Sequence, residues 1–480
     1  MRQRFEQQFS LGVLPISEVK IRIKSRDEMP PLLVALQKLF VTPELNEAVF
    51  TILEETICKN KKTGRQGMDL WHVLVLSVVR HECNTNWDKL HYFANNDMTM
   101  RSIMGLRNND FGDGFHEFEY QNILDNVSLL DAETINKINT VVVNYGVKLL
   151  KKKDEEVHHL KTDSFVVETN VHFPTDLNLL NDSVRKALKR ITKLIAKKKI
   201  SGEGWRKIHS RINNFKSLLR ATSWAVFNGK KEEYKKVRVK EYLAKATGIE
   251  TKIKEVLAIY SDEELIKYCS YIALFINQID RRLLKNEVIP AGEKVYSIFE
   301  EHTEWIIKGK RNPELGNMVM ITTNQHQLMM DYKIMFKEKD ASQIVPLIER
   351  LQSNYPNETI ESLSTDKGFY SKTNFESCLT AGIKKAIMPK KGKCNKEEYA
   401  REHEEAFIKL RRKHSAVESN INMLEHHGLN RCMDKGKANF ERCISLSVLA
   451  YNLHIIGNEL VRQMKIKEQK ERQKSFKKAA

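Results

Sequence analysis

Glu418 is a candidate for a chemical role; it lies in the stretch RRKHSAVESNINMLEHHGLNRC at 411–432. Apolar residues between Phe407 and Leu424 recur at helical spacing, which predicts an amphipathic helix that ends at Gly428. Glu418 falls on the border of the apolar stripe among polar neighbours, a place that core packing explains poorly. A carboxylate there can bind a hard cation such as Mg²⁺. The simpler interpretation is a solvated acid in a salt-bridged helix.

Two aspartates accompany segments that are predicted to be strands. Asp163 lies within LKTDSFVVET, which is rich in β-branched and aromatic residues, and Asp366 closes the short run TIESLSTD. Three acids brought together without a metal would repel one another, so a cluster of them needs a functional reason. Oxygen ligands are the ones that Mg²⁺ prefers.

The order of the predicted elements indicates the fold class. A strand with Asp163 is followed by a helical segment, a β-hairpin, a helix, a strand that ends at Asp366, a short strand and the helix with Glu418. This order is typical of an α/β, ribonuclease-H-like mixed-sheet core with a large helical insertion, here preceded by an all-α N-terminal domain. In that fold the two aspartates project from neighbouring strands, and the glutamate helix packs across the sheet.

Several sequence blocks carry a resemblance to a known family. In chain order they are SRDEMPPLL, GRQGMDLWHVLVL, DNVSLLD, DSFVVETNVHFPTDLNLL, VYSIFEEHTEWIIKGK and HSAVESNINMLEHHGLNRC. On these blocks, which extend over nearly the whole chain, the protein resembles bacterial insertion-sequence transposases of the DDE type, most closely those grouped as ISNCY. The resemblance implies that Asp163, Asp366 and Glu418 are the catalytic and metal-binding residues. It also implies two Mg²⁺ ions per active site, for which Mn²⁺ can substitute.

One position departs from the broader transposase pattern. Many related enzymes have a Lys or Arg two turns after the glutamate, where it holds a terminal phosphate, but this chain has Glu425. The phosphate contact is therefore expected from another basic residue. The candidate DNA-binding residues are Lys308, Lys310, Arg411, Arg412 and Arg431.

Other residues compete for the same roles. Glu168 and Asp176 follow Asp163 closely and are alternative first ligands, while Glu425 is an alternative third ligand. Histidines such as His414 could bind metal or transfer protons, although polar surface positions are the simpler interpretation. Tryptophans such as Trp305 could stack on unpaired bases, although core packing is the simpler interpretation.

The charge of the chain indicates a polyanionic partner. Lys and Arg outnumber Asp and Glu by 80 to 62, and the sequence pI is about 9.3. Between Arg185 and Arg220 there are 13 Lys or Arg and one acid, Glu203. A solvated helical hairpin would accommodate this charge, but a surface that follows DNA phosphates explains its one-sidedness as well. The expected partner is double-stranded DNA, namely the terminal inverted repeats and the target.

The sequence contains neither a stretch of 18 or more apolar residues nor the apolar core of a signal peptide at its start, so no membrane partner is expected. The seven cysteines are odd in number and form no CxxC pair, which argues against a disulfide framework and a structural zinc site. A reducing bacterial cytoplasm is the expected location, and the resemblance implies association with the nucleoid.

The chain is too long for one compact core, so several regions are expected. The helix-turn-helix outline near 68–96 makes the N-terminal region a candidate for DNA recognition. The predicted regions are a helical DNA-binding and dimerisation region (1–150), the first part of the catalytic core (155–176), a helical insertion (177–290), the remainder of the core (291–465) and a basic disordered tail (466–480).

These expectations combine into one functional prediction. The protein would bind the inverted repeats of its insertion sequence, hydrolyse phosphodiesters at the element ends and join the freed 3′-hydroxyls to target DNA by two-metal-ion transesterification. At least a homodimer is expected on DNA, because two ends must be cut in one complex. The alternatives are a structure-selective nuclease of the same fold and a catalytically silent, domesticated DNA-binding protein.

Overall fold

The computed structural model describes residues 2–7, 12–57, 67–108, 115–151, 157–307 and 312–479. The chain forms two compact units, one made of Met1–Asn170 with Gly316–Ala480 and the other of Val171–Leu315. We call them the first and the second unit. The first unit combines a mixed β-sheet with an all-helical N-terminal region, which confirms the predicted fold class.

The N-terminal region is a bundle built around α3. Every residue of α3 is buried, because its run LWHVLVLSVV is apolar on all sides. A turn at 83–86 connects it to α4, so the predicted helix–turn–helix outline is confirmed. The helices are α1 (Met29–Val41), α2 (Pro43–Ile57), α3 (Leu70–Glu82), α4 (Trp87–Asn96), α5 (Met98–Ile103), α6 (Tyr120–Val127) and α7 (Ala132–Leu150).

The sheet is centred on β1, a 13-residue strand. The neighbour of β1 on one side is β3, which is antiparallel and forms the predicted hairpin with β4; on the other side lies β5, which is parallel and is followed by β6. A two-residue strand, β7, pairs with the end of β1. The strands are β1 (Val157–Thr169), β3 (Glu314–Thr323), β4 (Met329–Met335), β5 (Thr359–Thr365), β6 (Lys385–Ile387) and β7 (Arg431–Cys432).

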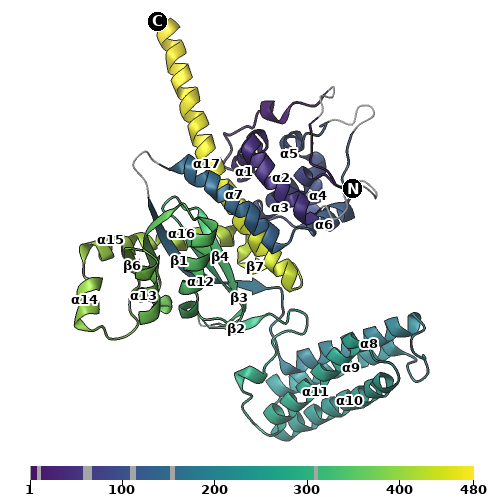
Figure 1. Ribbon diagram of the computed structural model, residues 1–480. Helices are drawn as coiled ribbons and strands as arrows, with labels where there is room; N and C mark the ends of the chain where they lie inside the picture. The colour runs from purple at the N-terminus through teal and green to yellow at the C-terminus, as the bar shows by residue number, and fades with distance from the viewer. Residues whose placement is uncertain are drawn as a thin grey trace. The chain divides into compact units, whose positions relative to one another are not determined.

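Helices cover both faces of this sheet. Leu160 and Met320 face the core shared with α7 and α12, whereas Phe165 and Ile321 face the core shared with α16 and α17. The long helix α17 also lies along α7 and α1 (Figure 1). The remaining elements are α12 (Ile344–Asn354), α13 (Lys372–Thr380), α14 (Lys396–Glu402), α15 (Glu405–His414), α16 (Ala416–Leu424), the π-helical turn η6 (Glu425–Leu429) and α17 (Lys437–Ala479).

Two sequence predictions about helices were wrong. The expected single helix before Gly428 is interrupted at Ser415, whose hydroxyl donates to the Arg412 carbonyl at 2.9 Å and competes with the helical hydrogen bonds. The expected disordered tail at 466–480 instead continues α17 as far as Ala479. Its Lys, Glu, Gln and Arg residues are good helix formers, and they extend a helix that is already nucleated.

The same helix α17 is the one element, among the described residues, with the length and apolar composition to cross a membrane. Its most apolar window is 72% buried inside the protein. The window lies against α1, α3 and α7, so its apolar side chains are already covered by other helices and give no clear membrane signal.

The second unit is a helical bundle with its own core. Phe215 and Tyr242 stack at its centre with ring centroids 4.7 Å apart. The predicted insertion at 177–290 covers these helices, and among the described residues of the segment 291–313 only β2 (Glu304–Ile306) is a strand. The helices are α8 (Asp176–Ala196), α9 (Ile208–Asn228), α10 (Glu232–Ile259) and α11 (Glu263–Ile279).

Candidate active site

Asp163 and Asp366 lie beside each other at one edge of the sheet. Thr162 of β1 pairs with Thr365 of β5 in parallel register, so the next residue on each chain is an aspartate. Neighbouring strands are about 4.8 Å apart and paired residues point to the same face. Asp163 is half-buried, and its Oδ1 accepts from the Ser164 backbone N–H at 2.7 Å. Asp366 is exposed where β5 ends.

Glu418 is carried to the same face by α16. Val417 is fully buried in the core that contains Phe165, which lies two residues after Asp163 on the same face of β1. Asn420 is also buried and donates to the Thr323 hydroxyl at 3.1 Å. These two contacts fix the first turn of α16 over β1 and β3, while Glu418 itself stays exposed.

The half-buried His414 at the end of α15 shows that two of the acids are near each other. Burial lowers the pKa of His414 below its ordinary value, while the negative charges of Asp366 and Glu418 act in the opposite direction. Both carboxylates are therefore close enough to act on one imidazole. Its Nδ1 has no hydrogen-bond partner in the described part of the chain. The sequence alone leaves open both a polar surface position and a metal-binding or proton-transfer role for His414.

The three acids do not form a closed metal cage. Among the described residues, no three His, Cys, Asp or Glu side chains lie close enough together to hold a metal ion. Repulsion between like charges favours such separation as long as no cation is bound. The donors are nevertheless the carboxylate oxygens that a hard divalent cation takes, and two of the three side chains are exposed and free of packing. The set therefore fits a divalent metal.

The alternative ligands lie elsewhere. Glu168 is five residues beyond Asp163 on the same strand and so points to the opposite face of the sheet. Asp176 belongs to the second unit and pairs with Arg282 at 2.9 Å. Glu425 is half-buried in the π-helical turn η6. Within the first unit, Asp163 and Glu418 therefore remain better candidates than Glu168 and Glu425.

The predicted DNA-binding residues are distributed unevenly. Arg411 and Arg412 are exposed on α15, so they remain available to a phosphate. Arg431 is exposed in β7, with its Nη2 3.5 Å from Asn170 Oδ1. Lys308 and Lys310 lie outside the described residues.

Lys161 is a nearby cation that sequence reasoning did not single out. It lies two residues before Asp163 on the same face of β1, yet it is only 8% exposed. Burial and the nearby charge of Lys413 lower the pKa of Lys161 below its ordinary value. Strand alternation alone would have placed it next to Asp163, but its burial depends on helices that are distant in sequence.

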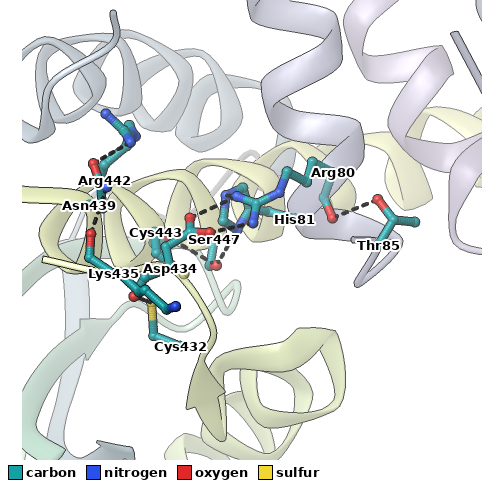
Figure 2. Close-up of polar contacts among 10 residues, drawn as sticks. All are labelled: Arg80, His81, Thr85, Cys432, Asp434, Lys435, Asn439, Arg442, Cys443 and Ser447. Carbon is teal, nitrogen blue, oxygen red and sulfur yellow. Dashed lines mark hydrogen bonds and ion pairs between the residues drawn. The ribbon is translucent and has the colours of Figure 1, made fainter. Parts of the chain in front are cut away.

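A buried polar network ties α3 to the start of α17, the helix that packs behind α16 (Figure 2). Arg80 donates to both carboxylate oxygens of Asp434, at 2.9 and 2.7 Å. Next to it, His81 Nδ1 lies 3.1 Å from the Ser447 hydroxyl. The N-terminal helices thereby brace the layer that carries Glu418.

Comparison with known proteins supports a transposase. Residues 287–453 match the family model described as transposase DDE domain. This segment includes Asp366 and Glu418 but begins after Asp163. No curated protein and no solved structure matches the chain. The matched segment supports the interpretation of the chain as a DDE transposase, a class of DNA-cleaving enzymes that generally use divalent metals.

Proposed function

We propose that this protein is an ISNCY-type transposase that binds the terminal inverted repeats of an insertion sequence, cuts at the element ends and joins them to target DNA. The observation that supports this most is the register of β1 and β5, which sets Asp163 beside Asp366 below the helix that carries Glu418. These are the three acids that the family resemblance selects. The pairing of β1 and β5 is a structural observation that does not depend on that resemblance.

In this proposal Asp163, Asp366 and Glu418 hold two Mg²⁺ ions, for which Mn²⁺ can substitute. Bound there, the ions would lower the pKa of the attacking water or 3′-hydroxyl and stabilise the leaving oxygen. Asp163 is oriented by the Ser164 N–H, while Glu418 is borne by a separate helix and completes the site from above. The exposed Arg411 and Arg412 would bind DNA phosphates beside it.

DNA binding is further supported by the second unit. Val171–Leu315 contains 30 Lys and Arg against 18 Asp and Glu, a net charge of +12 out of +18 for the whole chain. Lys189 and Lys193 of α8 and its C-cap residue Lys197 follow one another at four-residue spacing, and all three are exposed. This row would follow a phosphate backbone. We infer a dimer or larger assembly on DNA, since two ends must be processed together.

The test uses purified protein, Mg²⁺ and labelled duplexes that carry the inverted repeats flanking its gene. Asp366→Asn should lower cleavage and strand transfer about 10²- to 10³-fold, on the scale of removing a major electrostatic group from an active site, without weakening DNA binding. Glu168→Gln is the matched control, because that acid points to the other face of the sheet. Cleavage by Asp366→Asn at the wild-type rate would remove Asp366 from the site.

The same assay separates the rival functions. A structure-selective nuclease would cut in a metal-dependent manner but leave no joined products. A silent DNA-binding protein would bind the repeats tightly and cut nothing with either metal. Joined products that disappear in Asp366→Asn are expected only of a transposase.

A further inference from the structure

A pocket of about 280 Å³ with both polar and apolar lining residues opens next to the candidate active site, within the first unit. Its floor is formed by β1 and β5, and its rim by the junction of α15 and α16. At about 30 Å³ for a water in the liquid, the volume corresponds to roughly nine waters, enough for a phosphate and part of its sugar. The lining includes Lys161, Ser362, Ser364, Lys413, Ser415 and Ser419.

The charge of this pocket is unbalanced. Lys161 is buried, and within the described part of the chain no carboxylate forms an ion pair with it or with Lys413. A buried charge is costly unless an opposite charge or hydrogen bonds compensate it, and a second cation nearby adds repulsion. The pocket thus has the charge of an anion site without an anion from the protein.

A hydroxyl group gives a second, independent indication. Ser364 is 3% exposed and belongs to the pocket lining, and its Oγ has no hydrogen-bond partner among the described residues. Such a buried, unsatisfied group is rare in proteins and needs an explanation. Beside it, the Ser362 hydroxyl already pairs with His159 Nδ1 at 2.9 Å. Ammonium and hydroxyl donors around one space suit an oxyanion with several acceptors, such as a phosphate.

The pocket lies close enough to Asp163 and Asp366 to contact a DNA strand bound at these residues. Lys161 and Ser364 precede Asp163 and Asp366 by two residues on paired strands, so each pair shares a face and is about 7 Å apart along the strand. Successive phosphates of one DNA strand advance by about 3.4 Å along the helix axis. A strand at the two aspartates would therefore bring another phosphate to the pocket within one or two nucleotides.

We propose that this pocket binds a phosphate group of the DNA strand held at Asp163 and Asp366, with Lys161, Lys413 and Ser364 as its ligands. The preference of the pocket for a phosphate follows from its own residues. Only the assignment of that phosphate to the cleaved DNA strand rests on the proposed function.

The first arm of the test measures anion binding without catalysis. Inorganic phosphate should raise the Tm of the wild-type protein in a concentration-dependent way. Lys161→Met should abolish this effect, and Ser364→Ala should weaken the apparent phosphate affinity about tenfold. Lys333→Met is the control, because that strand lysine faces Glu338 at 3.8 Å instead of the pocket. Equal stabilisation of wild-type protein and Lys161→Met by phosphate would overturn the proposal.

Folding of the variants is itself informative. Without phosphate, Lys161→Met should melt no lower than wild type, because it removes an uncompensated buried charge. Ser364→Ala removes only an unpaired hydroxyl and should be nearly neutral. If Lys161→Met fails to fold, Ser364→Ala still carries the test, and an unchanged phosphate affinity in that variant would overturn the proposal.

The second arm identifies the phosphate, with Ca²⁺ in place of Mg²⁺ to measure binding by anisotropy. If the pocket holds a terminal phosphate, a pre-cut end with a 5′-phosphate should bind about tenfold tighter than one with a 5′-hydroxyl. If it holds a backbone phosphate, one neutral methylphosphonate within two nucleotides of the cut should weaken binding about tenfold. Either effect should vanish in Lys161→Met. If neither occurs, the assignment to DNA is wrong, even where Asp366→Asn has established the transposase.

Discussion

In the second unit, 30 Lys and Arg stand against 18 Asp and Glu, whereas the first unit carries 50 against 44. Lys189 and Lys193 of α8 and its C-cap residue Lys197 are exposed members of the former set. In the first unit, several cations are instead enclosed by partners. Arg80 pairs with Asp434, Arg350 pairs with Asp331, and the buried Arg101 donates to the carbonyls of Ala94 and Arg107. The second unit also pairs many of its cations, such as Arg190 with Asp262 and Arg281 with Glu287, but its larger excess of positive charge is left for an external polyanion.

The largest expected effect comes from breaking the pair between Arg80 and Asp434. Arg80→Met should lower the free energy of unfolding by about 3–5 kcal/mol, because it leaves Asp434 buried without a counter-charge. Hydrogen exchange followed by mass spectrometry should show faster exchange in α3 and α17, with α8–α11 unchanged. Equal acceleration in both units would contradict the assignment of this pair to the first unit alone.

The pH dependence of this pair has a defined sign. Burial raises the pKa of Asp434, but its hydrogen bonds to Arg80 and the charge of that residue more than offset this and leave the pKa below its ordinary value. A lowered carboxyl pKa contributes stability above the unfolded value, about 3.9, and loses it as the pH falls through the folded value. The stability difference between wild type and Asp434→Asn should therefore shrink below about pH 4.

In the second unit, loss of charge should weaken DNA binding rather than stability. Lys189→Gln, Lys193→Gln and Lys197→Gln together should leave its melting unchanged but weaken DNA binding roughly 10- to 100-fold near 0.1 M salt. The slope of log K against log salt should fall by about 2.7, at about 0.9 for each phosphate contact. The control makes the same change at Lys240, Lys245 and Lys252 of α10, where acids are interspersed. An unchanged slope would exclude α8 from the DNA surface.

A smaller loss of stability is expected from changes at Gly428, which packs against the turn between α3 and α4. Gly428 has φ +96°, and a Cβ there would lie 2.3 Å from Asn84 Oδ1, in the turn between α3 and α4. Gly428→Ala should destabilise by about 1–2 kcal/mol, the cost of a left-handed L-residue, plus the displacement of Asn84. Gly204 of the second unit has φ +73° and open space around it, so Gly204→Ala isolates the backbone cost. If chemical denaturation shows the same loss of unfolding free energy for Gly428→Ala and Gly204→Ala, then Asn84 moves aside at no cost.

Local patterns were enough to predict much of this fold. The β-branched run around Asp163, the hairpin at 314–335 and the termination of a helix at Gly428 each follow from residues within a few positions of one another. The burial of Lys161 does not, because it depends on how α15 and α16 sit on the sheet. The pair between Arg80 and Asp434 spans 354 residues, and no periodicity can indicate such a partner.

The smallest expected effect tests whether the large loss of stability predicted for Arg80→Met comes from burial of the ion pair or from the ion pair itself. Arg462 on α17 donates through Nε and Nη2 to both carboxylate oxygens of Glu459, at 2.7 and 2.6 Å, a forked contact like that of Arg80, which uses Nη1 and Nη2. Arg462 is exposed, so water and salt screen the pair and solvate whichever partner remains. Arg462→Met should therefore leave the denaturation midpoint unchanged within error. A loss comparable to that of Arg80→Met would show that the forked contact stabilises the first unit by itself, whether or not it is buried.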